Sequence, residues 1–189
     1  MPLTRYNTAP TLDGFIASPH TTNPTPWIVP DPTIDFPALY ASFSHFLMGR
    51  LTYETMVALA AADPTSAFLH GRPRASVVVL SATMNPAEHP AVTVVASEAE
   101  MVEMVRGWRA GGGKDVWVMG GGRVAGCLVR EGVLDVVEVA VMPVVIGEGV
   151  RMVEGVTPTG VRLGLEGVER LGTGIVMLRY RVLYGEGGK

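Results

Sequence analysis

Three short stretches of the sequence place glycine, hydroxyl or arginine residues directly after an apolar, strand-like run. They are Met48-Gly49-Arg50-Leu51-Thr52, Leu80-Ser81-Ala82-Thr83 and Met119-Gly120-Gly121-Gly122-Arg123. A helix that begins directly after a strand presents free backbone amides and the positive end of its dipole, and both favour phosphate. Glycine lets a phosphate approach the backbone, Arg50 can pair with it in bidentate fashion, and Thr52 and Ser81 can add hydroxyl donors.

Each stretch alone is also typical of a tight turn or of a solvated surface arginine. Three stretches of this kind, each after a strand, instead favour a ligand with several phosphates, such as a dinucleotide. In an open α/β sheet such ligands bind outside the carboxyl ends of the strands. The glycines do not form a Gly-x-Gly-x-x-Gly motif after the first strand, so an ordinary Rossmann domain is disfavoured.

The hydrophobic pattern predicts the elements that position these stretches. Apolar or alternating runs predict strands at Leu3–Ala9, His45–Met48, Val77–Leu80, Val92–Val95, Val116–Met119, Val136–Val145, Val161–Leu171 and Ile175–Tyr184. Helical spacing predicts helices over Phe36–Phe43 and Arg50–Ala61, behind a Ser97/Glu100 capping box, and up to about Arg130. This order predicts an α/β fold in one domain over residues 1–189, with a largely parallel sheet covered on both faces and an antiparallel C-terminal hairpin.

A long segment from Thr11 to Pro32 is rich in Pro, Thr and Asn and is predicted to be a loop. Asp13-Gly14 marks a turn within it. Loops of this length in a compact domain are usually lids or binding loops, and Trp27 and Ile28 favour a lid over a floppy insertion. Pro143, inside the predicted Val136–Val145 strand, indicates an edge or a bulge at that point.

Composition narrows the classes of function. The chain has 189 residues, of which 48% are hydrophobic and 17% charged, with a net charge of −3 and no long basic run. We therefore expect a globular domain that binds neither nucleic acid nor a membrane. Four scattered histidines give no metal-ligand spacing, and the single Cys127 excludes an internal disulfide. The N-terminus lacks the apolar core of a signal peptide, so we expect a cytoplasmic location.

Four motifs resemble the dihydrofolate reductase-like superfamily in type and order. They are Thr11-Leu-Asp-Gly-Phe-Ile-Ala17, Leu47-Met-Gly-Arg-Leu-Thr-Tyr-Glu54, Val116-Trp-Val-Met-Gly-Gly-Gly122 and Met142-Pro-Val-Val-Ile-Gly-Glu-Gly149. The most similar branch is the reductase domain of the bifunctional riboflavin-biosynthesis deaminase-reductase, in a free-standing form. The resemblance implies a mixed, mostly parallel sheet of about eight strands flanked by helices, with NADPH as cofactor.

The resemblance also implies residue roles. Gly49, Arg50 and Thr52 would hold the adenosine-side phosphates, and Ser81 would lie near the adenosine ribose and its 2′-phosphate. Gly120, Gly121 and Gly122, with the amides of Arg123 and Val124, would bind the pyrophosphate. Asp13, Gly14, Ile16 and Ala17 would lie in a mobile loop beside the nicotinamide.

The substrate side departs from the true dihydrofolate reductases, which place a carboxylate in the helix after the lid. Asp31 and Asp35 are both candidates for this proton-handling acid, and each also fits a structural role, as a turn acid before Pro32 or as a first-turn helix charge. Val139 falls where folate reductases have threonine, which disfavours folate. Arg72, Arg74 and Arg151 are the weak candidates for binding a substrate phosphate.

These features predict an NADPH-dependent reductase that transfers hydride to a small heterocyclic or ribosylamino-pyrimidine-type substrate. The alternatives are the same scaffold used in a secondary-metabolite step, and a cofactor-binding protein without turnover, because fold alone does not fix function. Related reductase domains pair, and apolar strand surface lies late in the chain. We therefore expect a homodimer that uses the Val136–Val145 strand and the final hairpin.

Overall fold

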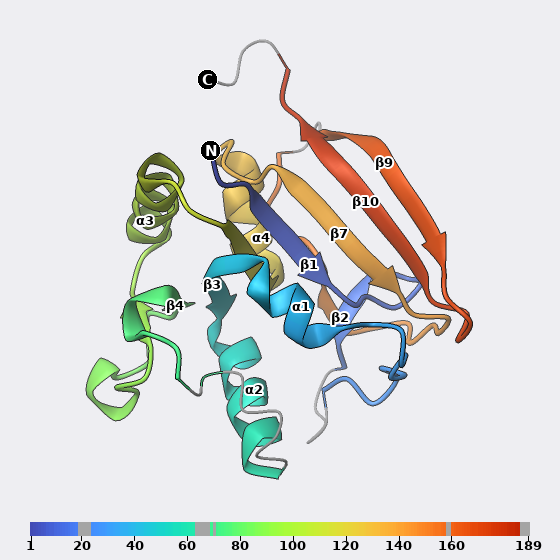
Figure 1. The fold of residues 1–189 in the computed structure, drawn as a ribbon, viewed down its shortest axis with the longest axis horizontal. Coiled ribbons are helices and arrows are strands. Elements are labelled where there is room, and N and C mark those ends of the chain that lie inside the picture. The colour runs from blue at the N-terminus through green and yellow to red at the C-terminus, as the bar shows by residue number, and fades with distance from the viewer. Residues whose placement is uncertain (19–23, 63–68, 70, 158–159, 186–189) are drawn as a thin grey trace.

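The computed structural model describes residues 1–18, 24–62, 69, 71–157 and 160–185. Its strands are β1 (Thr4–Thr8), β2 (Phe15–Ala17), β3 (Phe43–Gly49), β4 (Val77–Leu80), β5 (Thr93–Val95), β6 (Asp115–Gly120), β7 (Val136–Val141), β8 (Val150–Arg151), β9 (Arg162–Arg170) and β10 (Val176–Leu183). The α-helices are α1 (Phe36–Ala41), α2 (Arg50–Ala62), α3 (Glu98–Gly111) and α4 (Gly122–Arg130), and short 3₁₀ turns lie at Arg74–Ser76 and Pro86–Glu88. Figure 1 shows their arrangement.

Eight of the strands form one twisted sheet in the order β5-β4-β3-β6-β1-β7-β10-β9. The strands from β5 to β7 are parallel to one another, and the β9–β10 hairpin pairs antiparallel to β7. The prediction of a mostly parallel sheet with an antiparallel C-terminal hairpin is therefore confirmed. β4 is apolar throughout, and the apolar residues of β3 and β6 pack against helices on both faces of the sheet.

Helices α3 and α4 cover one face of the sheet, and α1 and α2 cover part of the other. The first interface holds side chains such as Tyr6, Leu47 and Leu128, all with no exposed surface. The second is built on aromatic rings, including Phe46 and Trp117, whose centroids lie 6.1 Å apart. These two layers hold the parallel strands rigidly, so the carboxyl ends of the strands form a fixed edge.

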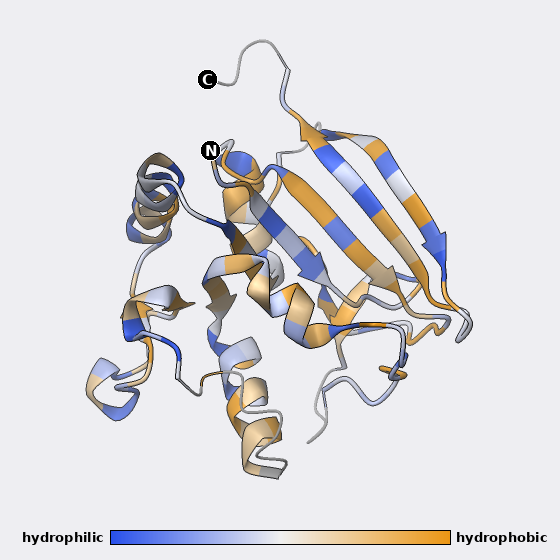
Figure 2. Cartoon of the chain, viewed as in Figure 1, coloured by the Kyte–Doolittle hydropathy of each residue, from blue (hydrophilic) through white to orange (hydrophobic). Residues whose placement is uncertain are grey.

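Beyond α1, the second face of β1, β7, β10 and β9 carries no helix among the described residues (Figure 1). Charged residues on this face form ion pairs between neighbouring strands. Arg5 binds Glu138 at 2.8 Å, Glu138 also pairs with Arg179, and Arg181 reaches Glu166 at 2.6 Å. Figure 2 shows the resulting alternation of hydrophilic and hydrophobic residues along β7 and β10. One face of these strands therefore packs on the core while the other stays polar.

Three predicted boundaries are wrong, each for a local reason. Phe43 begins β3 and does not extend the preceding helix, which ends at Ala41. The predicted Val136–Val145 strand ends at Val141, because Pro143 cannot donate a ladder hydrogen bond. The predicted loop from Thr11 to Pro32 contains β2, which pairs with the two-residue β8.

No helix in the described part of the chain is both long enough and apolar enough to cross a membrane.

Candidate functional site

The three predicted phosphate-binding stretches lie at one edge of the sheet. β4, β3 and β6 are neighbours, and in the ladders Gly49 is opposite Leu80 while Met48 is opposite Gly120. Because all three strands are parallel, their carboxyl ends meet at this edge, and α2 and α4 both begin there. Ser81 follows β4 at the same level. The sequence prediction that these stretches come together is confirmed.

A tight backbone contact joins the ends of β3 and β6. Gly121 has φ +98°, a conformation that favours glycine, and a Cβ there would lie 3.3 Å from the amide nitrogen of Gly49 and 3.2 Å from a methyl of Val124. Among the described residues, no side chain caps α4. The first amides of the helix, at Gly122, Arg123 and Val124, therefore have no partner within the helix and can bind an anion.

Packing within the protein also requires these glycines. A Cβ at Gly120 would lie 2.7 Å from the Thr52 hydroxyl oxygen, and one at Gly122 would overlap the carbonyl oxygen of Arg151. Sequence reasoning assigned the three glycines to a ligand and missed these contacts. It also missed Gly126, where a Cβ would lie 2.7 Å from the carbonyl carbon of Glu154. Gly122 and Gly126 are four residues apart and so lie on the same face of α4. This spacing is the sequence signal that another stretch of backbone packs closely against that face.

The side chains predicted to hold phosphate already have partners. Arg50 is 43% exposed and forms an i,i+4 ion pair with Glu54 at 2.7 Å. The Ser81 hydroxyl oxygen accepts hydrogen bonds from the amides of Thr83 and Met84 at 3.2 and 3.1 Å. Arg123 is 80% exposed, so its backbone amide and not its guanidinium belongs to the helix terminus. A phosphate at this edge would compete with Glu54 for Arg50.

Asp13 joins two of the motifs that are far apart in the sequence. Its carboxylate accepts hydrogen bonds from the Thr11 hydroxyl at 2.6 Å and from the amides of Ile146 and Gly147 at 3.1 and 2.7 Å. These donors, the Thr11 hydroxyl first, hold the pKa of Asp13 below its usual range. The next residue, Gly14, has φ +86°, as the turn requires. The Asp13-Gly14 turn and the loop after β7 therefore form one hydrogen-bonded unit.

Ile16 and Ala17 lie in β2, at the rim of this unit. Both are partly buried, and Ala17 is opposite Val150 in β8. A Cβ at Gly149 would overlap the carbonyl oxygen of Ala17, so the strand approaches the loop as closely as glycine allows. The predicted lid continues beyond this point, and its residues 19–23 lie outside the described part of the chain. Closure of the lid stays a prediction.

The two candidate acids both have structural partners. The buried carboxylate of Asp31 accepts hydrogen bonds from the amide of Thr33 at 2.9 Å and from the hydroxyl of Thr173, in the β9–β10 turn, at 2.7 Å. The Thr33 hydroxyl, which also donates to Asp31, is the first cause that holds its pKa below the usual range. Asp35 caps α1 by accepting a hydrogen bond from the amide of Ala38 at 2.9 Å. A proton-donor role for either acid stays a prediction, and the lowered pKa of Asp31 argues against it at neutral pH.

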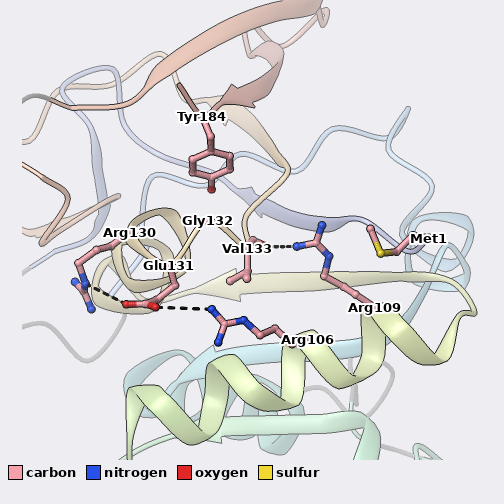
Figure 3. Close-up of a pocket in the computed structure, with 8 residues that line it drawn as sticks. All are labelled: Met1, Arg106, Arg109, Arg130, Glu131, Gly132, Val133 and Tyr184. Atoms are coloured by element: carbon pink, nitrogen blue, oxygen red, sulfur yellow. Dashed lines mark hydrogen bonds and ion pairs between the residues drawn. The ribbon is translucent and has the colours of Figure 1, made fainter. Parts of the chain in front are cut away.

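A hollow of about 500 Å³ lies at the opposite edge of the sheet. Figure 3 shows Arg106 and Arg109 on α3 facing Arg130 and Glu131 at the end of α4, with Tyr184 above them. Arg109 also pairs with Asp135, at 3.0 Å. The arginines of this hollow are neutralised by carboxylates, and the carboxyl-end edge remains the candidate site. The described residues contain no group of three or more His, Cys, Asp or Glu side chains that could hold a metal ion.

Comparison with known proteins agrees with this geometry. The family model of the RibD C-terminal domain matches residues 2–177. The uncharacterised protein YyaP of Bacillus subtilis is 26% identical over 148 residues, covering 75% of this chain and 74% of that protein.

Solved structures share the fold at low sequence identity. A putative riboflavin biosynthesis protein from Shewanella has a TM-score of 0.74 at 22% identity, covering 96% of this chain and 99% of its own. A deaminase and 5-amino-6-(5-phosphoribosylamino)uracil reductase from Thermotoga maritima has a TM-score of 0.67 at 18% identity, and the match spans 96% of this chain but 57% of that protein. On the match over nearly its whole length, the chain belongs to the RibD C-terminal domain family.

Proposed function

We propose that this protein is an NADPH-dependent reductase that transfers hydride to the carbon of a C=O or C=N bond in a small molecule. The observation that carries the proposal is the junction of β3, β6 and α4, where Gly49 and Gly121 meet beside the free amides of a helix N-terminus. That junction offers an anion site, because no side chain caps the first amides of α4 with a hydrogen bond. Membership of a family that includes a uracil reductase supports the same chemistry.

Under this proposal the cofactor lies along the carboxyl ends of β4, β3 and β6. The amides of Gly122, Arg123 and Val124 hold the pyrophosphate, and Arg50, Thr52 and Ser81 face the adenosine end. Asp13, Gly14, Ile16 and Ala17 border the nicotinamide. Bound NADPH supplies the hydride, and the protein orients both reactants and excludes water.

Binding titrations with NADPH and NADH test the cofactor assignment. A charge-assisted hydrogen bond contributes about 1.5–3 kcal/mol, so Arg50→Ala is expected to weaken NADPH binding by about ten- to a hundred-fold. The existing pair with Glu54 places the expected loss toward the lower end of this range. NADH, which lacks the 2′-phosphate, should lose far less. Arg106→Ala is the matched control, because Arg106 also forms a helix-surface ion pair, with Glu103.

A second variant separates the pyrophosphate site from the 2′-phosphate site. Gly121→Val places a branched side chain against Gly49 and Val124 at a positive φ, and should weaken both cofactors alike. If Arg50→Ala weakens the binding of NADPH and NADH equally, Arg50 is only a surface arginine and its assignment to the 2′-phosphate fails. If Gly121→Val folds and binds both cofactors normally, the pyrophosphate assignment fails.

Limited proteolysis tests the lid. Cleavage between Thr11 and Pro32 should slow at saturating NADPH, because closure over the nicotinamide would shield the segment from the protease. Cleavage at the same rate with and without NADPH would refute closure of the lid.

A further inference from the structure

The carboxyl-end edge of the sheet is divided into two halves of different chemistry. The half formed by β4, β3 and β6 ends in glycine and hydroxyl residues. The half formed by β1 and β7 ends in two loops, onto which the segment 24–35 packs. Trp27, Ile34 and Val144 all contact one apolar cluster built on Met142 and Ile175, which joins this segment to the loop after β7.

Large apolar side chains are exposed around this second half. Leu12 is 69% exposed and Val145 is 64% exposed, and their loops are tied by a hydrogen bond from the Leu12 amide to the Val144 carbonyl at 2.9 Å. The facing segment adds Ile28 and Val29, and the first residue of α1 adds Phe36; these side chains are 43–48% exposed. Exposed apolar side chains around one part of the surface favour an apolar partner or ligand there.

The described segments that build this half contribute acids and no basic residue. These segments, 6–18, 24–49, 131–150 and 171–178, contain no Lys or Arg. Four acids lie in its loops: Asp13, Asp31, Asp35 and Glu148. Three arginines border these segments: Arg5 is held by Glu138 and Asp115, Arg179 is held by Glu138 and Glu166, and the Arg151 guanidinium lies 5.9 Å from the centre of the Phe15 ring. A phosphate or carboxylate placed here would face carboxylates with no cation from these segments to pair with it, although Arg or Lys is the usual partner of such groups.

We propose that this half binds an uncharged or cationic substrate with an apolar face, and that the substrate carries no phosphate. The inference rests on the proposed function, since it names the molecule that would receive the hydride. Hydride adds to the carbon of the C=O or C=N bond, a proton from water adds to the oxygen or nitrogen, and NADPH is oxidised to NADP⁺. The substrate class therefore differs from the phosphoribosylamino compound named for the Thermotoga maritima protein.

Calorimetric titration with two probes tests the proposal, each probe with and without saturating NADPH. The probes are 3,4-dihydroisoquinoline, an apolar cyclic imine, and ribose 5-phosphate. The unaltered protein should bind the imine and give no measurable heat with the phosphate ester. Val145→Lys should weaken imine binding by about ten-fold or more, since it replaces apolar contact with a charge. Leu59→Lys is the matched control, because Leu59 is a similarly exposed apolar residue, on α2.

Each outcome decides one question. Tighter binding of ribose 5-phosphate than of the imine overturns the proposal, as do equal imine affinities of the Val145→Lys and Leu59→Lys variants. A change of oligomeric mass in Val145→Lys with unchanged imine binding would also overturn it, because the patch would then be a protein interface. If NADPH itself does not bind, the proposed function fails, while the titration without cofactor still decides what this half binds.

Discussion

Replacing Gly126 by alanine should destabilise the protein, although alanine is the better helix former. An ideal Cβ on Gly126 would lie 2.7 Å from the carbonyl carbon of Glu154 and closer still to its oxygen, whereas carbon atoms pack best at about 3.5–4.0 Å. The obstacle is backbone, held by hydrogen bonds from the Glu154 amide to the Gly122 carbonyl and from the Met152 amide to the Gly14 carbonyl. Relief therefore requires the whole segment 151–154 to shift.

The expected magnitude follows from two opposed effects. Alanine in place of glycine inside a helix gains about 0.5–1 kcal/mol, and overpacking a tight contact costs about 1–3 kcal/mol or more. Because the overlap is with backbone, the cost should dominate, and the melting temperature should fall by about 2–4 °C for each kcal/mol lost. Thermal and urea unfolding followed by circular dichroism would measure the change.

Gly107→Ala provides the matched control. Gly107 lies inside α3, and a Cβ there would meet nothing within 4 Å, so this variant should be more stable than the unaltered protein by the helix-propensity gain alone. Opposite signs for the two variants are the expected result. If Gly126→Ala is as stable as Gly107→Ala, the segment 151–154 does not press on α4, and the packing explanation of these glycines is wrong.

Three further predictions concern other parts of the molecule. His45 stacks on Trp108 with ring centroids 4.4 Å apart, and burial lowers the pKa of His45. The unfolded state therefore binds more protons, and the stability of the protein should fall below about pH 6.5. Urea titrations above and below this pH should show a smaller loss of stability for His45→Phe than for the unaltered protein. Asp31→Ala and Thr173→Val should destabilise non-additively in a double-mutant cycle, because each removes one partner of the same hydrogen bond, and additive losses would contradict the contact. We expect a homodimer by light scattering and a monomer for Leu165→Lys, since Leu165 is 57% exposed on the edge strand β9; a monomeric unaltered protein would refute this.

Much of the sheet could be predicted from sequence because its strands carry strong local signals. Val77–Leu80 is wholly apolar, as a strand buried on both faces must be, and the final strand alternates. β2 and β8 were missed because runs of three and two residues hold no detectable period. Phe43 fits the helical spacing of the residues before it, but tertiary packing places it at the start of β3.

The candidate site was predictable to the extent that it depends on topology. Once the strands are parallel, Gly49, Ser81 and Gly120 must share an edge. The partners of Asp31 and Gly126 were not predictable, because Thr173 and Glu154 reach them only through the folded chain. The sequence allowed a structural role for each acid and a tight turn at each glycine stretch, but it could not name the partners that the fold supplies.

The central place of β1 has a consequence for how the chain comes to fold. This strand precedes the other strands of the sheet in the sequence, and it lies between β6 and β7. The amide of Leu3 finds its partner in Asp115, 112 residues later, and that of Thr4 finds Asp135, 131 residues later. During most of translation β1 therefore has two unpaired edges, and the nascent chain must be kept from pairing with other chains. Such distant pairing also makes folding slower than in a helical protein of the same length. The central strand of the sheet is therefore among the last to complete its pairing.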